Sequence, residues 1–193
     1  EVTDMAGEGG GDEPEPEADV IKISSAGDLA TFAERVNSGD AAAMKAEVTL
    51  ENDIDCSSIG DWTPIGACTM PTWAHNSAVA SGYLFSGSFD GKGHSLKNLH
   101  LSFAPDVAAG AWGLFGGLGD GASVKDVIFD ETCSMNISTS VSGVFGMLAG
   151  LAMGVDIDNV QTYASITGGG TSSLPNNVAG GRIMAGGIVG FVI

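Results

Sequence analysis

A Gly-rich motif recurs along this chain, and its recurrence constrains the fold more than any other feature. The chain reads GLFGG from Gly113, GVFG from Gly143 and GGIVG from Gly186. Short segments that place an Asn or Asp between apolar residues accompany these glycines: LKNL at Asn98, VKDV at Asp126 and IDNV at Asn159. The three Asx positions lie 28 and 33 residues apart. A period of roughly 30 residues is typical of an architecture that stacks one structural unit on the next.

The residues around each Asx predict short strands joined by sharp corners. Apolar residues alternate with polar ones, which is the pattern of a strand, and Asn and Asp enter the left-handed backbone conformation more readily than other non-glycine residues. One such corner per layer predicts that Asn98, Asp126 and Asn159 stack in a single column. We therefore expect an all-β fold, a right-handed parallel β-helix whose coils bury a continuous interior. An antiparallel sandwich is the rival, but it does not predict equivalent motifs at near-constant spacing.

Composition narrows the class of partner. The chain has 193 residues, with 24 acidic and 7 basic side chains, and so a formal net charge of −17. This charge argues against nucleic acid and against an anionic membrane surface as partners, and it disfavours a polyuronate substrate. Apolar runs fall short of the roughly 18 residues of a membrane-spanning helix.

Three regions follow from the change in composition along the chain. Residues 1–19 hold eight acids and no base, and such a segment buries too little surface to offset its ordering entropy, so we expect a disordered tether. Residues 20–46 are predicted to form a strand and a capping helix, and residues 47–193 the coils. The chain stops at Ile193 within a repeat, so we expect a truncated stack whose apolar end is available for self-association or a further domain.

The predicted helix begins after Ser25, which stands three residues before Asp28 at the spacing of a capping box. Leu29, Phe32 and Val36 lie on one helical face. A single amphipathic helix ahead of stacked strands is suited to cover the end of the stack, so we interpret it as an N-terminal cap. Trp62, next to Pro64, is expected to pack against this cap region.

Five landmarks occur in order from residue 20 onward: SAGDLATFAERVNSG, VTLENDIDCSS, WTPIG, FSGSFDGKGHSLKNLHLS and WGLFGGLGDGASVKDVIF. Over residues 20–193 the chain thereby resembles a family of bacterial surface β-helix proteins of gut Bacteroidetes and Firmicutes whose repeats include the GLUG motif. The resemblance implies the β-helix fold, export, and a lipid anchor in the outer membrane. It further implies a non-catalytic adhesin-like module, with no cofactor and no catalytic residue to carry over, that contacts a glycan or a surface protein.

Four residues are candidates for ligand contact. Trp73 and His75 lie in an irregular segment, residues 67–82, which is longer than expected at this junction, and long loops on a rigid scaffold often carry binding residues. Tyr83 and Trp112 are further aromatic candidates for stacking against a sugar. The competing interpretation of Trp73 is a plug that holds the loop against the stack.

Two other functions stay open. The first is a polysaccharide lyase or glycoside hydrolase, for which the candidate bases are Lys92, Lys97, Lys125 and Arg182. Lys97 and Lys125 are predicted at one corner of successive coils, and the competing interpretation is that they are solvated turn residues. Asp156 and Asp158, which flank a supposedly inward Ile157, are the candidate carboxylates. The second is a structural stalk that carries another domain.

No metal site is predicted, because the histidines and cysteines lack ligand spacing. The cysteines are Cys56, Cys68 and Cys133, and the spacing leaves open whether Cys56 and Cys68 form a disulfide.

Overall fold

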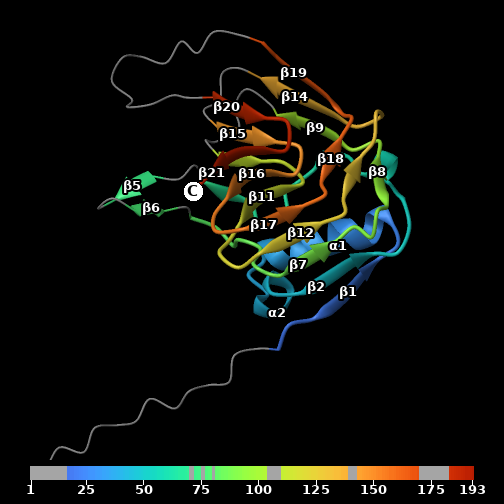
Figure 1. The fold of residues 1–193 in the computed structure, drawn as a ribbon, viewed down its shortest axis with the longest axis horizontal. Helices are drawn as coiled ribbons and strands as arrows, with labels where there is room; N and C mark the ends of the chain where they lie inside the picture. Colours follow the sequence, from blue (N-terminus) through green and yellow to red (C-terminus); the bar gives the residue numbers. More distant parts are fainter. Residues whose placement is uncertain are drawn as a thin grey trace, which may run out of the picture.

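A computed structural model describes residues 17–69, 72–74, 77–79, 81–103, 110–138, 143–169 and 183–193. These residues form a mostly β structure with parallel sheets, and the described part contains two α-helices, both near its N-terminal end (Figure 1). Residues 1–16 of the predicted tether lie outside the described residues. Asp19 at the tether's end is fixed, because its carboxylate lies 2.6 Å from the Arg35 guanidinium and its carbonyl accepts from the Glu47 N–H.

The N-terminal elements are β1 (Val20–Ile23), α1 (Ala26–Asn37), α2 (Ala41–Met44) and β2 (Glu47–Leu50). The predicted helix is confirmed: the Ser25 hydroxyl caps α1 by accepting from the Asp28 N–H at 3.2 Å. The Asp28 carboxylate in turn accepts from the Ser24 N–H at 3.0 Å, just ahead of the helix. Among the described residues, no helix is long and apolar enough to cross a membrane.

The remaining strands recur in order, and corresponding strands of successive layers pair in parallel. The first sheet has the order β1-β2-β7-β12-β17, with β7 (Ser88–Asp90), β12 (Ser123–Lys125) and β17 (Asp156–Asp158). The second has the order β18-β13-β8-β3, with β3 (Ile54–Asp55), β8 (Ser95–Lys97), β13 (Ile128–Phe129) and β18 (Gln161–Thr162).

Three further sheets complete the layers. One is β19-β14-β9, made of β9 (His100–Phe103), β14 (Ser134–Ser138) and β19 (Ser165–Gly169). Another contains β10 (Gly110–Trp112), β15 (Gly143–Gly146) and β20 (Ile183–Gly186), with β4 (Cys68–Thr69) antiparallel at its edge. The last contains β11 (Phe115–Leu118), β16 (Ala149–Ala152) and β21 (Val189–Val192). Two short strands, β5 (Thr72–Ala74) and β6 (Ser77–Val79), form a separate antiparallel pair.

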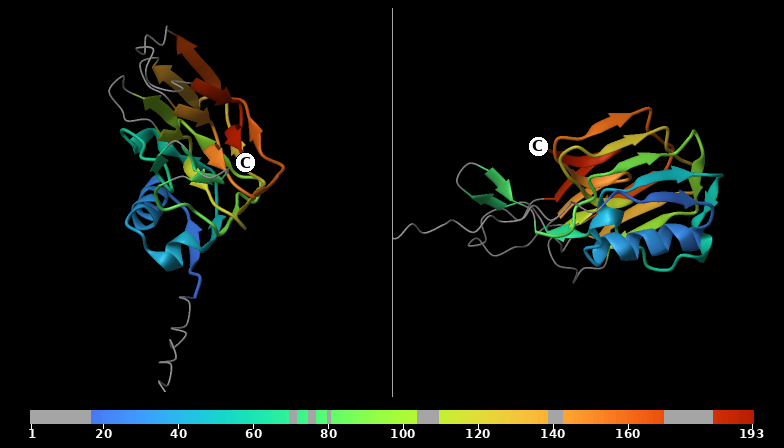
Figure 2. Two further views of the ribbon diagram at one scale, coloured as in Figure 1. Left: turned by 90° about the vertical axis from the view of Figure 1, so that its left-hand side faces the viewer. Right: turned by 90° about the horizontal axis from the view of Figure 1, so that it is seen from below.

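The layers follow one another in chain order, with α1 and β1 at the first end and β17 to β21 at the other (Figure 2). The Gly-rich motifs lie where neighbouring layers approach closely. A Cβ added at Gly113 would lie 2.4 Å from the carbonyl oxygen of Gly146 in the next layer. A larger residue is therefore excluded there unless the backbone shifts.

The observed register corrects the predicted column of Asx residues. Ser88, Ser123 and Asp156 are register partners and lie 35 and 33 residues apart. Asp126 and Asn159 share the corner that follows this sheet, as predicted, whereas Asn98 lies at the next corner, between β8 and β9.

Corner length explains the error. Four residues join β7 to β8 and two join β8 to β9, whereas two join β12 to β13 and four join β13 to β14. The LKNL and VKDV motifs are two-residue corners that occur at different places in their layers.

The predicted conformation of the Asx residues is confirmed. Asn98, Asp126 and Asn159 have φ values of 53°, 54° and 46°. Their side chains also bond between layers, because Asn159 Nδ2 donates to Asp126 Oδ1 at 2.6 Å and Asn98 Nδ2 donates to Asp55 Oδ1 at 2.9 Å. The corners at Asn98 and Asn159 therefore combine a tight turn with a side-chain bond to the layer before.

Aromatic rings join α1 to the strand layers in one continuous core. The Phe32 ring on α1 contacts Phe85 edge-on, with 5.5 Å between centroids, and Phe85 stacks on Phe115 at 5.4 Å. Phe89 also contacts Phe115, with the rings nearly perpendicular and 5.5 Å between centroids. These contacts pack α1 against the strands at its end of the molecule.

Candidate functional site

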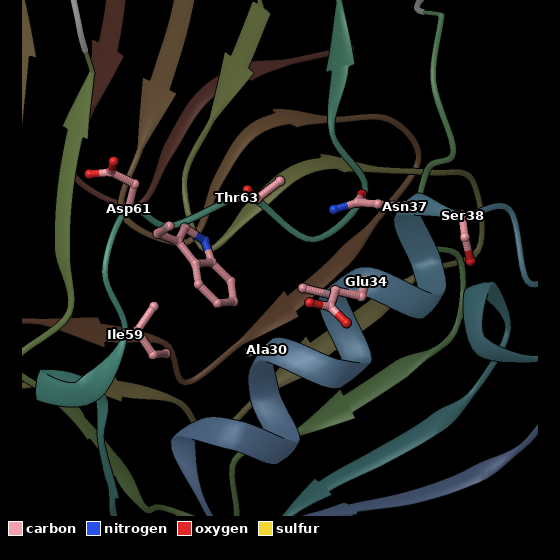
Figure 3. Close-up of a pocket in the computed structure, with 9 residues that line it drawn as sticks. Ala30, Glu34, Asn37, Ser38, Ile59, Asp61 and Thr63 are labelled. Atoms are coloured by element: carbon pink, nitrogen blue, oxygen red, sulfur yellow. The ribbon is translucent and has the colours of Figure 1, made fainter.

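A groove on the surface lies between α1 and the segment Ile59–Thr63, with a volume of about 410 Å³ (Figure 3). It is lined by Ala30, Ala33, Glu34, Asn37, Ser38, Ile59, Asp61, Trp62 and Thr63. Concave sites with apolar walls and a few polar groups are where proteins most often bind small ligands. This groove is therefore the best candidate for a functional site among the described residues.

Trp62 is held rigidly within the groove. Its indole N–H lies 3.1 Å from the Gly113 carbonyl oxygen and 3.2 Å from that of Leu114, and donates to them. The ring is largely buried and belongs to the main core together with residues of α1. The bonds of Trp62 thus join its segment to the strand layers, and its ring lines the groove opposite α1.

Asn37 fixes the far wall of the groove to the helix. Its Nδ2 donates to the Pro64 carbonyl at 2.9 Å, and its Oδ1 accepts from the Ala67 N–H at 2.9 Å. Both ends of this amide are used within the chain. The segment after Trp62 is therefore anchored to the last turn of α1, and the groove is already formed before any ligand binds.

Two carboxylates are available at the groove. Glu34 and Asp61 are exposed, and neither side chain forms a hydrogen bond or ion pair with another described residue. The neighbouring Arg35 forms its ion pairs with other carboxylates, because its guanidinium lies 2.6 Å from both Asp19 and Asp40. The groove therefore combines an aromatic and aliphatic surface with two negative charges that can accept hydrogen bonds or pair with a cation.

Tyr83 lies at the C-terminal end of α1, and half of its surface is exposed (50%). Its ring covers Gly39, where a Cβ would come within 2.8 Å of the ring carbon Cε1. Gly39 also has a φ of +82°, so a glycine is required there on both counts. Because Gly39 follows Ser38 of the groove directly, Tyr83 presents an aromatic face beside one end of the groove.

The other predicted ligand residues lie elsewhere. Trp73 is in β5, but its side chain is not among those described, and His75 lies outside the described residues. Trp112 is in β10, half-buried against the main core, so it does not present the exposed corner that the sequence suggested. Of the four predicted residues, only Tyr83 is seen with an exposed ring among the described side chains.

The predicted placement of Lys97 and Lys125 at the same corner of successive layers is wrong. The two lysines lie on different sheets, in β8 and β12. Lys97 Nζ lies 2.7 Å from Asp53 and Lys125 Nζ lies 3.2 Å from Asp90. Hydrogen bonding to Asp53 raises the pKa of Lys97, so the amine stays protonated at neutral pH and is not available as a general base. Lys92, another candidate base, lies 3.0 Å from Glu51, and Arg182 lies outside the described residues.

The carboxylates that line the outer walls are mostly structural. The Lys92 ammonium beside Glu51 holds the pKa of that carboxyl below its usual value, and Lys97 does the same for Asp53. A general acid needs the opposite shift. Ile157, between Asp156 and Asp158, lies at the predicted inward position, because its register partner Val124 is buried, but Ile157 itself is partly exposed.

The cysteines are free thiols and not a disulfide. Burial raises the pKa of Cys56 to about 12 and that of Cys68 to about 11, and it also raises the pKa of Cys133. Thiols with raised pKa values are poor nucleophiles at neutral pH. Within the described residues, no group of three or more His, Cys, Asp or Glu side chains is placed to hold a metal ion.

The sequence indicated Trp62 and Tyr83 as individual residues but did not indicate Glu34 or Asp61. Glu34 is on the polar face of an amphipathic helix, where a charge is ordinary, and Asp61 precedes Trp62 without a motif. Their common surface arises only from the packing of α1 on the Ile59–Thr63 segment. Comparison of the chain with family models, curated proteins and solved structures gave no match, so the assignment of a function depends on this geometry alone.

Proposed function

We propose that this protein is a non-catalytic binding module of adhesin type that contacts a glycan through the groove between α1 and Ile59–Thr63. The observation that carries the proposal is the preformed groove, in which Trp62 is held rigidly while Glu34 and Asp61 have no partner among the described residues. Sugars present apolar ring faces and many hydroxyl donors, and these match the apolar lining of the groove, the half-exposed ring of Tyr83 and the two carboxylate acceptors. Tyr83 would extend this contact beyond the end of α1.

The charge of the groove selects the class of glycan. Glu34 and Asp61 repel uronic acids and sulfated sugars, and the net charge of −17 acts in the same direction. A neutral or amino-substituted glycan is therefore the proposed ligand. The paired lysines and the lowered carboxyl pKa values on the outer walls support binding over polysaccharide cleavage.

The finer fold assignment and the setting belong to the same proposal. We infer a right-handed parallel β-helix capped by α1, and five sets of recurring strands with parallel pairing support it. The ordered landmarks from SAGDLATFAERVNSG to WGLFGGLGDGASVKDVIF support kinship with bacterial surface β-helix proteins that carry GLUG-like repeats. In that setting the module would be exported and lipid-anchored at the outer membrane.

A glycan array tests the proposal, with binding and product release read in parallel. Wild type should bind neutral or amino-substituted glycans saturably. Glu34→Gln, Asp61→Asn and Tyr83→Ala should each weaken binding about tenfold, which is the loss of one hydrogen bond to a charged group or one ring contact. Glu131→Gln, an exposed acid at a distant corner, is the matched control and should bind like wild type.

Other outcomes redirect the assignment. Loss confined to Trp73→Ala would move the site to residues 67–82, and loss confined to Trp112→Ala would move it to the β10 sheet. Shortened or unsaturated products would replace the binding module with an enzyme. Failure to bind any glycan would favour a protein partner or a structural stalk.

A further inference from the structure

The layer formed by β17 to β21 leaves one end of the stack open. Each of the five parallel sheets ends on one of these strands, so the outer backbone groups of the whole layer lack a neighbouring strand among the described residues. Figure 2 shows this layer at the end of the stack opposite α1. We call it the open end. Unpaired strand edges of this kind are templates for adding further strands.

The inward side chains confirm that the open end is only partly covered. In the first sheet, Val124 of β12 is completely buried (0%), whereas its register partner Ile157 of β17 is 36% exposed. In the third sheet, Met135 of β14 is completely buried (0%), whereas its partner Ile166 of β19 is 38% exposed. The change occurs in one step between two adjacent layers, so the exposed residues occupy positions that are interior in the layer before.

The charges along the first sheet specify what would complement this edge. Asp90, Lys125 and Asp158 are register partners in successive layers, so their charges alternate in sign. Lys125 forms its ion pair with Asp90, at 3.2 Å. The described residues of the open end carry two acids, Asp156 and Asp158, and no base. Opposite charges directly across from each other stabilise paired strands, and like charges destabilise them.

We propose that the open end binds a partner polypeptide by strand addition to β17, and that the added strand carries Lys or Arg opposite Asp158. A second copy of this chain fits less well, because pairing β17 with β17 brings Asp156 and Asp158 of both copies together. The backbone is placed for the addition. Asp156 N–H and Asp158 C=O bond to the β12 side, so the N–H and C=O of Ile157 face outward.

This surface is separate from the groove beside α1, and the two proposals are tested independently. The probe is a fluorescein-labelled, capped peptide with the chain's own sequence GASVKDVIFD, residues 121–130. Within the protein, this segment contains β12, which pairs with β7 and places Lys125 opposite Asp90. A second peptide carries Lys125→Glu. Anisotropy titrations use the full chain as wild type, as Asp158→Lys, and as Asp61→Asn, which is the groove control.

Wild type should bind the lysine peptide about fivefold more tightly than the glutamate peptide, as expected from one favourable and one unfavourable cross-strand pair. Asp158→Lys should reverse this preference, 1 M salt should reduce it, and Asp61→Asn should leave it unchanged. Hydrogen exchange at the Ile157 amide should slow when the lysine peptide is bound.

Equal binding of the two peptides, or no reversal in Asp158→Lys, would overturn the proposal. Loss of peptide binding in Asp61→Asn would place the peptide in the groove and equally overturn it. Sedimentation provides a further check on whether the open end binds a second copy of the chain. If wild type is a dimer and Asp156→Lys or Asp158→Lys changes the dimer's stability, the partner at the open end is a second copy, and the proposal is overturned. These peptide results can be interpreted whether or not the glycan screen finds a ligand for the groove.

Discussion

Two isoleucines at opposite ends of the stack provide a direct test of how its ends are covered. Ile54 lies in β3, the outermost strand of the second sheet at the α1 end, and Ile157 lies in β17, the outermost strand of the first sheet at the open end. Both are in edge strands, yet Ile54 is 1% exposed and Ile157 is 36% exposed. Substitution of each by alanine therefore removes the same atoms from two different environments.

The expected losses follow from these exposures. Removing three carbon atoms from a buried site costs about 2.4 kcal/mol of transfer free energy, and the remaining cavity brings the loss for Ile54→Ala to about 3–4 kcal/mol. Ile157 has about two-thirds of this burial, and water can fill the space that alanine leaves. Ile157→Ala should therefore cost about 1.5 kcal/mol. The free energies of unfolding of the two variants should differ by about 2 kcal/mol.

Urea unfolding at pH 7, followed by circular dichroism and by tryptophan fluorescence, measures this difference. Coincidence of the two signals checks that the layers unfold together, because stacked repeats can lose cooperativity. Ile54→Val, with an expected loss of about 1 kcal/mol, is a milder control at the covered end. Losses for the two alanine variants that agree within about 0.5 kcal/mol, the usual effect of a surface change, would refute the contrast between a covered and an open end.

Two further predictions concern the bonds that position the groove and the outer walls. Trp62→Phe should keep a ring in the groove but leave the Gly113 carbonyl without its indole donor, which should lower the free energy of unfolding by about 1–3 kcal/mol; an unchanged urea midpoint would show that this bond is dispensable. Stability should also fall in acid, because the pKa values of Glu51 and Asp53 are lowered in the folded state by their lysine partners. Their stabilising contribution is complete above about pH 5 and is lost as the pH falls through the lowered folded-state values, so a urea midpoint that stays constant between pH 7 and pH 3 would contradict this assignment.

Local features were predictable from the sequence because their causes lie within a few residues. The α1 helix follows from Ser25 as a cap and an apolar stripe at helical spacing, and both are present in the structure. The left-handed conformation of Asn98, Asp126 and Asn159 likewise follows from the side-chain type and a two-residue corner. The mostly β character and the parallel pairing followed from the repeat itself, since equivalent strands stack on equivalent strands.

Register and site depended on contacts between distant residues, which the sequence does not encode in any single segment. The alignment of LKNL with VKDV placed Asn98 in the wrong column because two-residue and four-residue corners exchange places between layers. The supposed pair of Lys97 and Lys125 failed for the same reason. Glu34 and Asp61 meet only because Trp62 and Asn37 hold the Ile59–Thr63 segment against α1. By itself the sequence thus determined the kind of strand, the kind of corner and the N-cap of α1. Only tertiary packing decided which residues face each other, because register is set by backbone hydrogen bonds across the whole layer.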